Sequence, residues 1–133
     1  MFFLLGYGAC YAKSQNGAVI ISYTRIGEDE YPDESLRAEQ FIEQIELLHN
    51  NGYNIAPVLT IVNMLKNGDI LPEKTIGITF DGAYRSAYTQ AMTVLIQKEI
   101  PFTVFYSSEL ANKENFQMMS WDELKAVKRY KFV

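Results

Sequence analysis

The sequence predicts an α/β fold, because short apolar runs alternate with stretches whose apolar residues recur at helical spacing. Four runs have the length and the β-branched or aromatic content of buried strands: 18–23, 53–56, 75–80 and 102–106. Helical spacing or a helix start signal follows each of them. About four strand-helix units in succession indicate a parallel sheet with helical cover. The 133 residues are enough for one modest domain.

The first unit begins with Ala18 to Tyr23 (AVIISY), a run that predicts a buried strand. An acidic turn at 27–35 contains Pro32. Gly52 is expected to end the helix that follows. That helix is predicted from apolar residues at helical spacing, which are Ala38, Phe41, Ile42, Ile45 and Leu48.

The second unit has a very short strand at 53–56 and a helix that ends near Gly68. The third has the strand TIGITF at 75–80, in which Ile76, Ile78 and Phe80 alternate with Thr75, Gly77 and Thr79. Pro101 ends the third unit. The helical stripe of the second unit is Val58, Ile61, Val62 and Leu65, and that of the third is Tyr88, Ala91, Met92, Leu95 and Ile96.

The fourth unit begins with the strand FTVFY at 102–106. Ser120 and Glu123 have the spacing of a capping box, which predicts a last helix that runs to about Tyr130. Its basic residues suit the negative end of the helix dipole. They are Lys125, Lys128, Arg129 and Lys131.

Composition narrows the class of protein. Hydrophobic residues make up 48% and charged residues 21%, which is typical of a globular domain. The net charge is −4 with no basic stripe, so no nucleic-acid partner is expected. The nine tyrosines suit a sugar-facing groove, although an ordinary core is the favoured explanation.

The first twelve residues are uncharged and mostly apolar, and Lys13 follows them. This pattern predicts a signal peptide at 1–12, and hence export to the periplasm or cell envelope. A buried N-terminal strand is the alternative. Cys10 is the only cysteine, so an internal disulfide is impossible. A lipid anchor on Cys10 is disfavoured, because Tyr7 stands where such signals have an aliphatic residue.

The alternation is satisfied by a closed barrel or by an open doubly wound sheet, and in both the functional residues collect at the carboxyl ends of strands. Just past Phe80 the sequence reads ITFDGAYRS at 78–86. It resembles the T-F-D-D-G motif of the NodB-homology polysaccharide deacetylases. Other segments match in order: ISYTRIGE at 21–28, FIEQIELLHNNGYNIAPV at 41–58, NGDILPEKTIGITFDGAYRS at 67–86, IPFTVFY at 100–106 and MMSWDELK at 118–125.

The likeness is nearest to the branch that deacetylates poly-β-1,6-N-acetylglucosamine. It implies a partial (β/α) barrel of the polysaccharide-deacetylase type, with 18–133 as the N-terminal part of a barrel of about seven strands. It also implies metal-assisted amide hydrolysis, in which a divalent metal such as zinc polarises the acetamide carbonyl. A carboxylate acts as general base and a histidine as general acid.

Carried over residue by residue, Asp81 matches the catalytic base. Gly82 stands where the family has a metal-binding aspartate, and it has no side chain to ligate with. Ala83 replaces a glycine, and Thr24 stands where the related branch often has histidine. The family's H-x-x-x-H motif is expected beyond Val133. A one-residue gap would instead align Asp81 with the metal ligand, although the ungapped alignment is preferred.

The resemblance therefore implies a polysaccharide-deacetylase-like hydrolase that is inactive as written and holds no metal cofactor. The expected ligand is an N-acetylated cell-envelope or biofilm polysaccharide. Expected partners are a second copy or a complementary C-terminal half, because four strands leave sheet edges unsealed. The alternatives are a glycan-binding pseudoenzyme and a decayed gene remnant.

Several polar residues have simpler explanations. His49, the only histidine, is expected to be solvated at the end of a helix. Asp81 could instead cap a helix that begins at Ser86. A solvated loop is expected for the acidic residues near Pro32, which are Glu28, Asp29, Glu30, Asp33 and Glu34.

Overall fold

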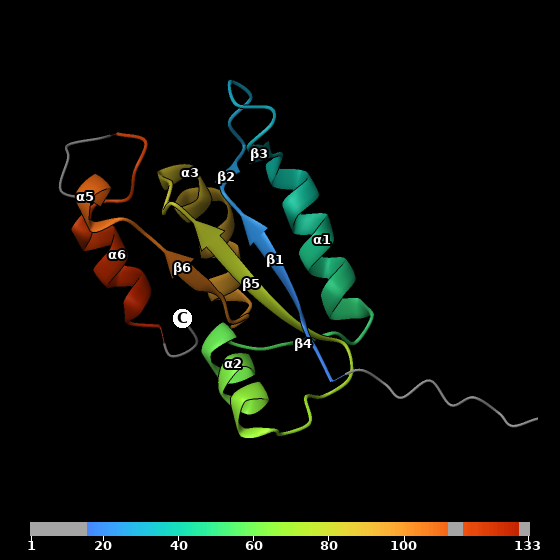
Figure 1. Cartoon of the computed structure of the whole chain (residues 1–133). Coiled ribbons are helices and arrows are strands. Elements are labelled where there is room, and N and C mark those ends of the chain that lie inside the picture. Colours follow the sequence, from blue (N-terminus) through green and yellow to red (C-terminus); the bar gives the residue numbers. More distant parts are fainter. Residues whose placement is uncertain (1–15, 112–115, 131–133) are drawn as a thin grey trace, which may run out of the picture.

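The computed structural model describes residues 16–111 and 116–130 (Figure 1). The predicted signal peptide at 1–12 lies outside the described residues. Within the described ranges, no helix is long and apolar enough to cross a membrane. The described strands are β1 (Val19–Tyr23), β2 (Arg25–Ile26), β3 (Ser35–Leu36), β4 (Asn54–Ile55), β5 (Thr75–Asp81) and β6 (Thr103–Phe105).

The main sheet is parallel and is centred on β5. On one side β1 pairs with β5 from Val19 opposite Ile76 to Tyr23 opposite Phe80. On the other side β4 pairs with the start of β5, and β6 pairs with its end. The four predicted strands are therefore confirmed, and so is their parallel arrangement. The small β2–β3 pair was not predicted; it lies in and beside the acidic turn.

The helices also follow the sequence pattern. Gly68 takes a left-handed backbone conformation directly after the second helix, as expected of a glycine stop. The third predicted helix is one continuous helical stretch that contains a π-helical turn, which the periodicity did not indicate. The described helices are α1 (Ala38–Asn50), α2 (Val58–Asn67), α3 (Arg85–Ala87), η1 (Tyr88–Met92), α4 (Thr93–Gln97), α5 (Ser108–Ala111) and α6 (Trp121–Lys128).

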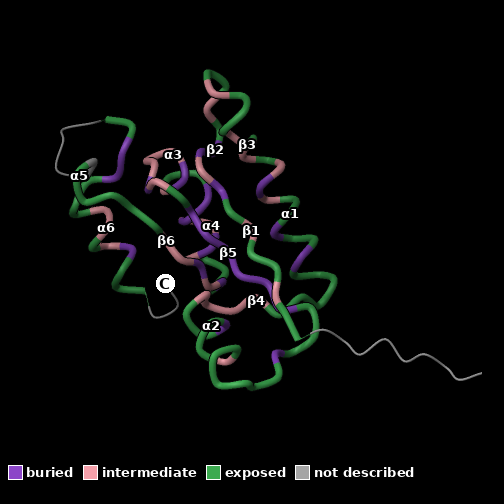
Figure 2. The backbone as a smooth tube through the Cα atoms, viewed as in Figure 1, coloured by how far each residue is buried: buried purple, intermediate pink, exposed green. Residues whose placement is uncertain are grey.

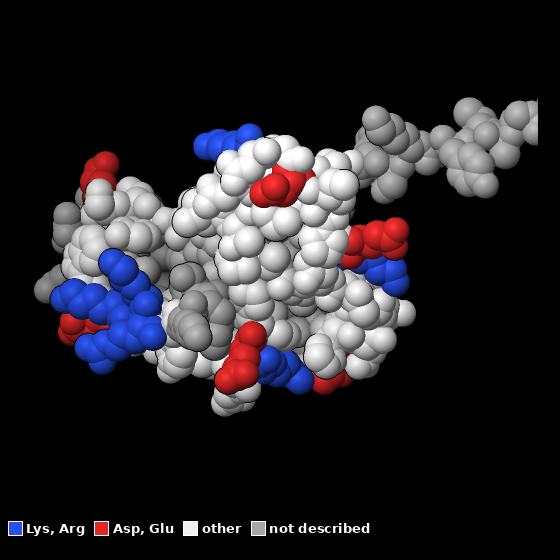
Figure 3. Space-filling model, turned by 90° about the horizontal axis from the view of Figure 1, so that it is seen from below, with Lys and Arg blue, Asp and Glu red and all other residues white. Residues whose placement is uncertain are grey.

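The last helix begins as predicted. The Ser120 hydroxyl accepts a hydrogen bond from the Glu123 backbone, and the Glu123 carboxylate accepts one from the Ser120 backbone. This reciprocal pair satisfies two of the N–H groups that a helix start leaves without partners. Lys125 and Lys128 lie in the last turn. Figure 3 shows basic side chains gathered on the left of the molecule, over α6.

The strand β5 is buried on both faces over its first six residues (Figure 2). One face carries Ile76, Ile78 and Phe80 into the core that α1, η1 and α4 share. The other face is closed at its start by α2, since a Cβ at Gly77 would lie 3.1 Å from Val58. The alternation in TIGITF therefore separates two buried faces. Strands buried on both sides are usual in parallel sheets.

The second face is open toward the carboxyl ends of the strands. Ser22 and Asp81 are exposed there, and Ile20 is 45% exposed. Phe105, which is opposite Asp81 in the strand register, is 53% exposed. In contrast to the helix-covered face, this surface presents polar groups and isolated apolar side chains to solvent.

Tyr23 makes the core sensitive to high pH. Its side chain is buried, and its hydroxyl donates a hydrogen bond to Gln44. Burial raises the pKa of Tyr23 from 10.0 to about 12. Above pH 10 the unfolded chain releases this proton while the folded chain keeps it. The contribution of Tyr23 to the free energy of unfolding is therefore fully present below pH 10. It is lost as the pH rises toward 12.

We expect this tyrosine to remove about 1.4 kcal/mol of unfolding free energy at pH 11 relative to pH 9. Urea unfolding of the native chain and of Tyr23→Phe at both pH values measures it. The phenylalanine variant should lose less stability over this interval, because position 23 no longer titrates. Equal losses in the two proteins would contradict the prediction.

Candidate functional site

Asp81 is the last residue of β5 and lies on the open face of the sheet. The Ser22 hydroxyl donates a hydrogen bond of 2.9 Å to its Oδ2. The register explains the contact, because Ser22 is opposite Thr79, two residues before Asp81 on the same face. The result is an exposed carboxylate oriented by a hydroxyl from the neighbouring strand.

The chain turns sharply after Asp81. Gly82 has a φ of +94° and Ala83 a φ of +51°, so two successive residues adopt left-handed backbone conformations. Glycine adopts this conformation freely, whereas alanine is strained in it. Hydrogen bonds hold the turn: the Gly82 N–H donates to the carbonyl of Phe105, and the Met119 N–H donates to the carbonyl of Ala83.

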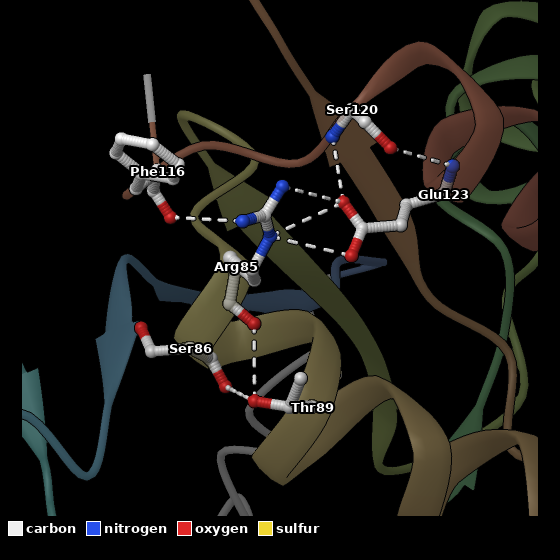
Figure 4. Close-up of polar contacts among 6 residues, drawn as sticks. All are labelled: Arg85, Ser86, Thr89, Phe116, Ser120 and Glu123. Carbon is white, nitrogen blue, oxygen red and sulfur yellow. Dashed lines mark hydrogen bonds and ion pairs between the residues drawn. The ribbon is translucent and has the colours of Figure 1, made fainter. Parts of the chain in front are cut away.

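Arg85 ties the start of α3 to the start of α6 (Figure 4). Its guanidinium donates to the Glu123 carboxylate at 3.3 Å and to the carbonyl of Phe116 at 3.2 Å. The residue before α3 is Tyr84, and no side chain in the part of the chain that the structure describes caps this helix. The alternative in which Asp81 caps the helix is therefore wrong, because Asp81 faces Ser22 instead.

A buried arginine lies beside this turn. Arg25 is 5% exposed, and its guanidinium is stacked between the rings of Tyr31 and Tyr84, 3.9 Å from each ring centroid. Its Nη1 lies 2.6 Å from the Glu28 carboxylate, and its Nε lies 3.4 Å from that of Glu34. Two segments distant in sequence, residues 25–34 and the turn at Tyr84, thus meet around one cation.

The environment favours the charged form of Arg25. Burial by itself lowers its pKa, but the hydrogen bond and charge of Glu28, followed by Tyr84 and Tyr31, raise the pKa above its ordinary value. Sequence reasoning missed this cluster. Only an arginine directly after a strand, with acidic and aromatic residues a few positions later, could have indicated it.

The structure corrects part of the prediction for the acidic residues. Asp29, Glu30 and Asp33 are exposed, as expected of a solvated loop. Glu28 and Glu34 instead form ion pairs with Arg25. Glu28 is thus largely withdrawn from solvent into the cluster, whereas Glu34 pairs with Arg25 while it stays exposed.

His49 lies in the last turn of α1 and is exposed, as predicted. The residues just after α1 contact the start of β5, where Lys74 donates to the carbonyl of Asn51. His49 is therefore at the end of the sheet opposite to Asp81. The only histidine of the chain cannot take part in a site at the turn.

A cleft of about 430 Å³ lies along β1 and β3. Ser22, Thr24, Arg25, Glu34 and Gln44 are among its lining residues. Thr24 therefore shares this cleft with Ser22, the hydrogen-bond partner of Asp81. The cleft offers hydroxyl, carboxylate and amide groups for hydrogen bonds.

The groups at the turn do not fit a divalent metal. Among residues 16–111 and 116–130, no three side chains of His, Cys, Asp or Glu lie close enough together to hold a metal ion. Asp81 is followed by Gly82, and its nearest polar partner is a serine hydroxyl. A catalytic zinc site normally has three protein ligands and one open position.

Comparisons with known proteins agree with this geometry. A family model described as "Polysaccharide deacetylase" matches residues 68–131, which include β5, the turn and α6. Residues 68–131 therefore match part of a polysaccharide deacetylase domain. In keeping with this, the chain is 30% identical over 136 residues to the poly-beta-1,6-N-acetyl-D-glucosamine N-deacetylase of Escherichia coli strain K12. That alignment covers 89% of this chain and 20% of the relative, so the chain spans about a fifth of the length of that deacetylase.

Solved deacetylase structures have the same fold. IcaB from Ammonifex degensii superposes with a TM-score of 0.78 at 25% identity, over 88% of this chain and 50% of the other. A de-N-acetylase from Aggregatibacter actinomycetemcomitans superposes with a TM-score of 0.73 at 19% identity, over 87% of this chain and 52% of the other. The deacetylase fold shows that the sheet is part of a (β/α) barrel. The periodicity of the sequence had left both a barrel and an open doubly wound sheet possible.

Proposed function

We propose that this chain is a deacetylase-like protein whose ligand is an N-acetylated cell-envelope or biofilm polysaccharide. We propose further that the chain by itself does not hydrolyse the acetamide. The observation that carries the proposal is the position of Asp81, an exposed carboxylate at the strand end of a deacetylase fold, without a metal-binding set around it among the described residues.

The chemistry of amide hydrolysis supports the second half of the proposal. Asp81 can accept a proton from water, which is the role its matching residue has in the family. The described residues include no metal-binding set that could stabilise the negative charge that develops on the carbonyl oxygen. A base without such stabilisation accelerates hydrolysis of an unactivated amide very little.

The open face supports the first half. The Asp81 carboxylate, the Ser22 hydroxyl and the exposed ring of Phe105 come from three neighbouring strands at one end of the sheet. Sugar hydroxyls hydrogen-bond to carboxylates and hydroxyls, and the apolar faces of sugar rings pack on aromatic rings. A sugar bound here would also lie close to the cleft along β1.

The proposal includes a protein partner and a location. The chain spans about half the length of solved deacetylases. A groove of about 330 Å³ lies between β6 and α6, and its lining includes Val104, Trp121 and Leu124. The complementary half of a deacetylase barrel would cover it, and self-association would be the other means of cover. Export to the periplasm or cell envelope stays a prediction from residues 1–12.

Incubation of the purified chain with a β-1,6-linked N-acetylglucosamine oligomer tests the proposal. We expect no release of acetate, with or without added zinc. We also expect weak binding, measured as chemical-shift changes at Ser22, Asp81 and Phe105, that Asp81→Asn reduces severalfold. Glu46→Gln, on the exposed side of α1, is the matched control and should bind as the native chain does.

Two results would overturn the proposal. Acetate release that Asp81→Asn abolishes would show that the chain hydrolyses the amide. No shift changes at millimolar oligomer would remove the glycan-binding role and leave a decayed remnant as the explanation.

A further inference from the structure

Gly82 has almost no room for a side chain. A Cβ added there would lie 2.6 Å from Cε2 and 3.2 Å from Cδ2 of the Tyr84 ring. Real Cβ atoms do not approach other heavy atoms at the first of these distances, so the ring would have to move. The φ of +94° adds backbone strain for any residue other than glycine.

The Tyr84 ring is not free to move aside. The Arg25 guanidinium carbon lies 3.9 Å from the centroid of the Tyr84 ring and also 3.9 Å from that of the Tyr31 ring. Glu28 holds Arg25 through an ion pair. The Tyr84 backbone is also fixed, because it forms a β-bridge with Met118. A displaced ring would therefore disturb a buried cation and the segment before α6.

We infer that the turn after β5 is shaped to exclude any side chain at position 82, through the packing of Tyr84 on Gly82 and of Arg25 on Tyr84. The absence of a second carboxylate is then a property of the whole Arg25–Tyr84–Gly82 arrangement, and one substitution cannot restore it. This inference concerns the shape of the turn, and its test does not depend on glycan binding or hydrolysis.

A double-mutant cycle tests it through stability. Gly82→Ala adds only a Cβ, and Gly82→Asp adds the carboxylate as well. Both are expected to lower the ratio of folded to unfolded chain by about a hundredfold, through the sum of clash and backbone strain. In a Tyr84→Ala background, Gly82→Ala should lower the ratio of folded to unfolded chain by only about tenfold. The clash is then gone, and only the backbone strain remains.

Gly68 provides the matched control. It has a φ of +77°, and a Cβ built there meets nothing within 4 Å. Gly68→Ala therefore reports backbone strain alone. It should lower the ratio of folded to unfolded chain by about tenfold, compared with about a hundredfold for Gly82→Ala. Tyr84→Leu serves as the second background, since it keeps an apolar side chain while removing the ring.

Two further measurements report on the packing of Arg25 against the tyrosine rings and on zinc binding at position 82. In Gly82→Ala the NMR signal of the Arg25 side-chain N–H should shift, because the Tyr84 ring that contacts the guanidinium moves. Zinc should not raise the unfolding midpoint of Gly82→Asp above that of Gly82→Ala. The inference is overturned if Gly82→Ala costs no more than Gly68→Ala. Equal losses from Gly82→Ala in the native chain and in the Tyr84→Ala background, or zinc stabilisation specific to Gly82→Asp, would overturn it as well.

Discussion

Phe80→Ala is expected to lower the free energy of unfolding by about 3–5 kcal/mol, the cost of emptying a large core position. Phe80 is 0% exposed and lies in the central strand. Its ring contacts three other aromatic rings, those of Tyr23, Phe41 and Phe102, with centroids 5.7, 6.2 and 5.7 Å away. Because these rings come from β1, α1 and the start of the β6 segment, the cavity would loosen several elements at once.

Urea or thermal unfolding followed by circular dichroism measures this loss. A domain of this size has only about 5–15 kcal/mol of stability, so the variant could be largely unfolded at 37 °C. Phe105→Ala is the matched control, since the same atoms are removed from a ring that is 53% exposed on the neighbouring strand. It should cost less than about 1 kcal/mol. Equal costs at the two positions would show that the aromatic core is not packed as described.

Arg25→Ala is the second large effect, with an expected loss of about 3 kcal/mol, because a buried side chain packed on two rings is removed and the partly buried Glu28 loses its partner charge. Here Glu28 and Glu34 would lose their cation, and Tyr31 and Tyr84 would lose the group stacked between their rings. The turn that carries Asp81 would lose its connection to the loop after β1.

Chemical denaturation of Arg25→Ala, Arg25→Lys and Arg37→Ala separates the contributions. Arg25→Lys keeps the charge but not the planar group between two rings, so its loss should be intermediate. Arg37 is exposed just before α1, and Arg37→Ala should change stability by less than about 0.5 kcal/mol. A loss at Arg25 no larger than that at Arg37 would mean that the cluster does not stabilise the fold.

Local signals in the sequence predicted most of the elements. The capping box depends on two residues three positions apart, and both of its hydrogen bonds are present at Ser120 and Glu123. The strand at 75–80 was indicated by its β-branched content and its apolar residues. Its position at the centre of the sheet was not, because pairing on both sides depends on strands that are distant in the sequence.

The candidate site divides in the same way. Asp81 could be found from the sequence, because it directly follows a buried strand and the segment resembles a family motif. Its hydrogen bond to Ser22 and the enclosure of Arg25 could not, since each joins residues that no spacing relates. The acidic residues near Pro32 show the limit of the sequence: their charge predicted solvation, but Glu28 is partly buried against Arg25.

By itself the sequence determined the order and type of the elements, the fold class and the place of the one aspartate at a strand end. These depend on periodicity, on turn residues and on caps, all of which act over a few positions. Only the tertiary structure decided that a tyrosine ring lies against Gly82 and that a buried arginine holds it. The reason is that packing in a parallel sheet brings together segments far apart in the chain, and the space left at one residue depends on all of them.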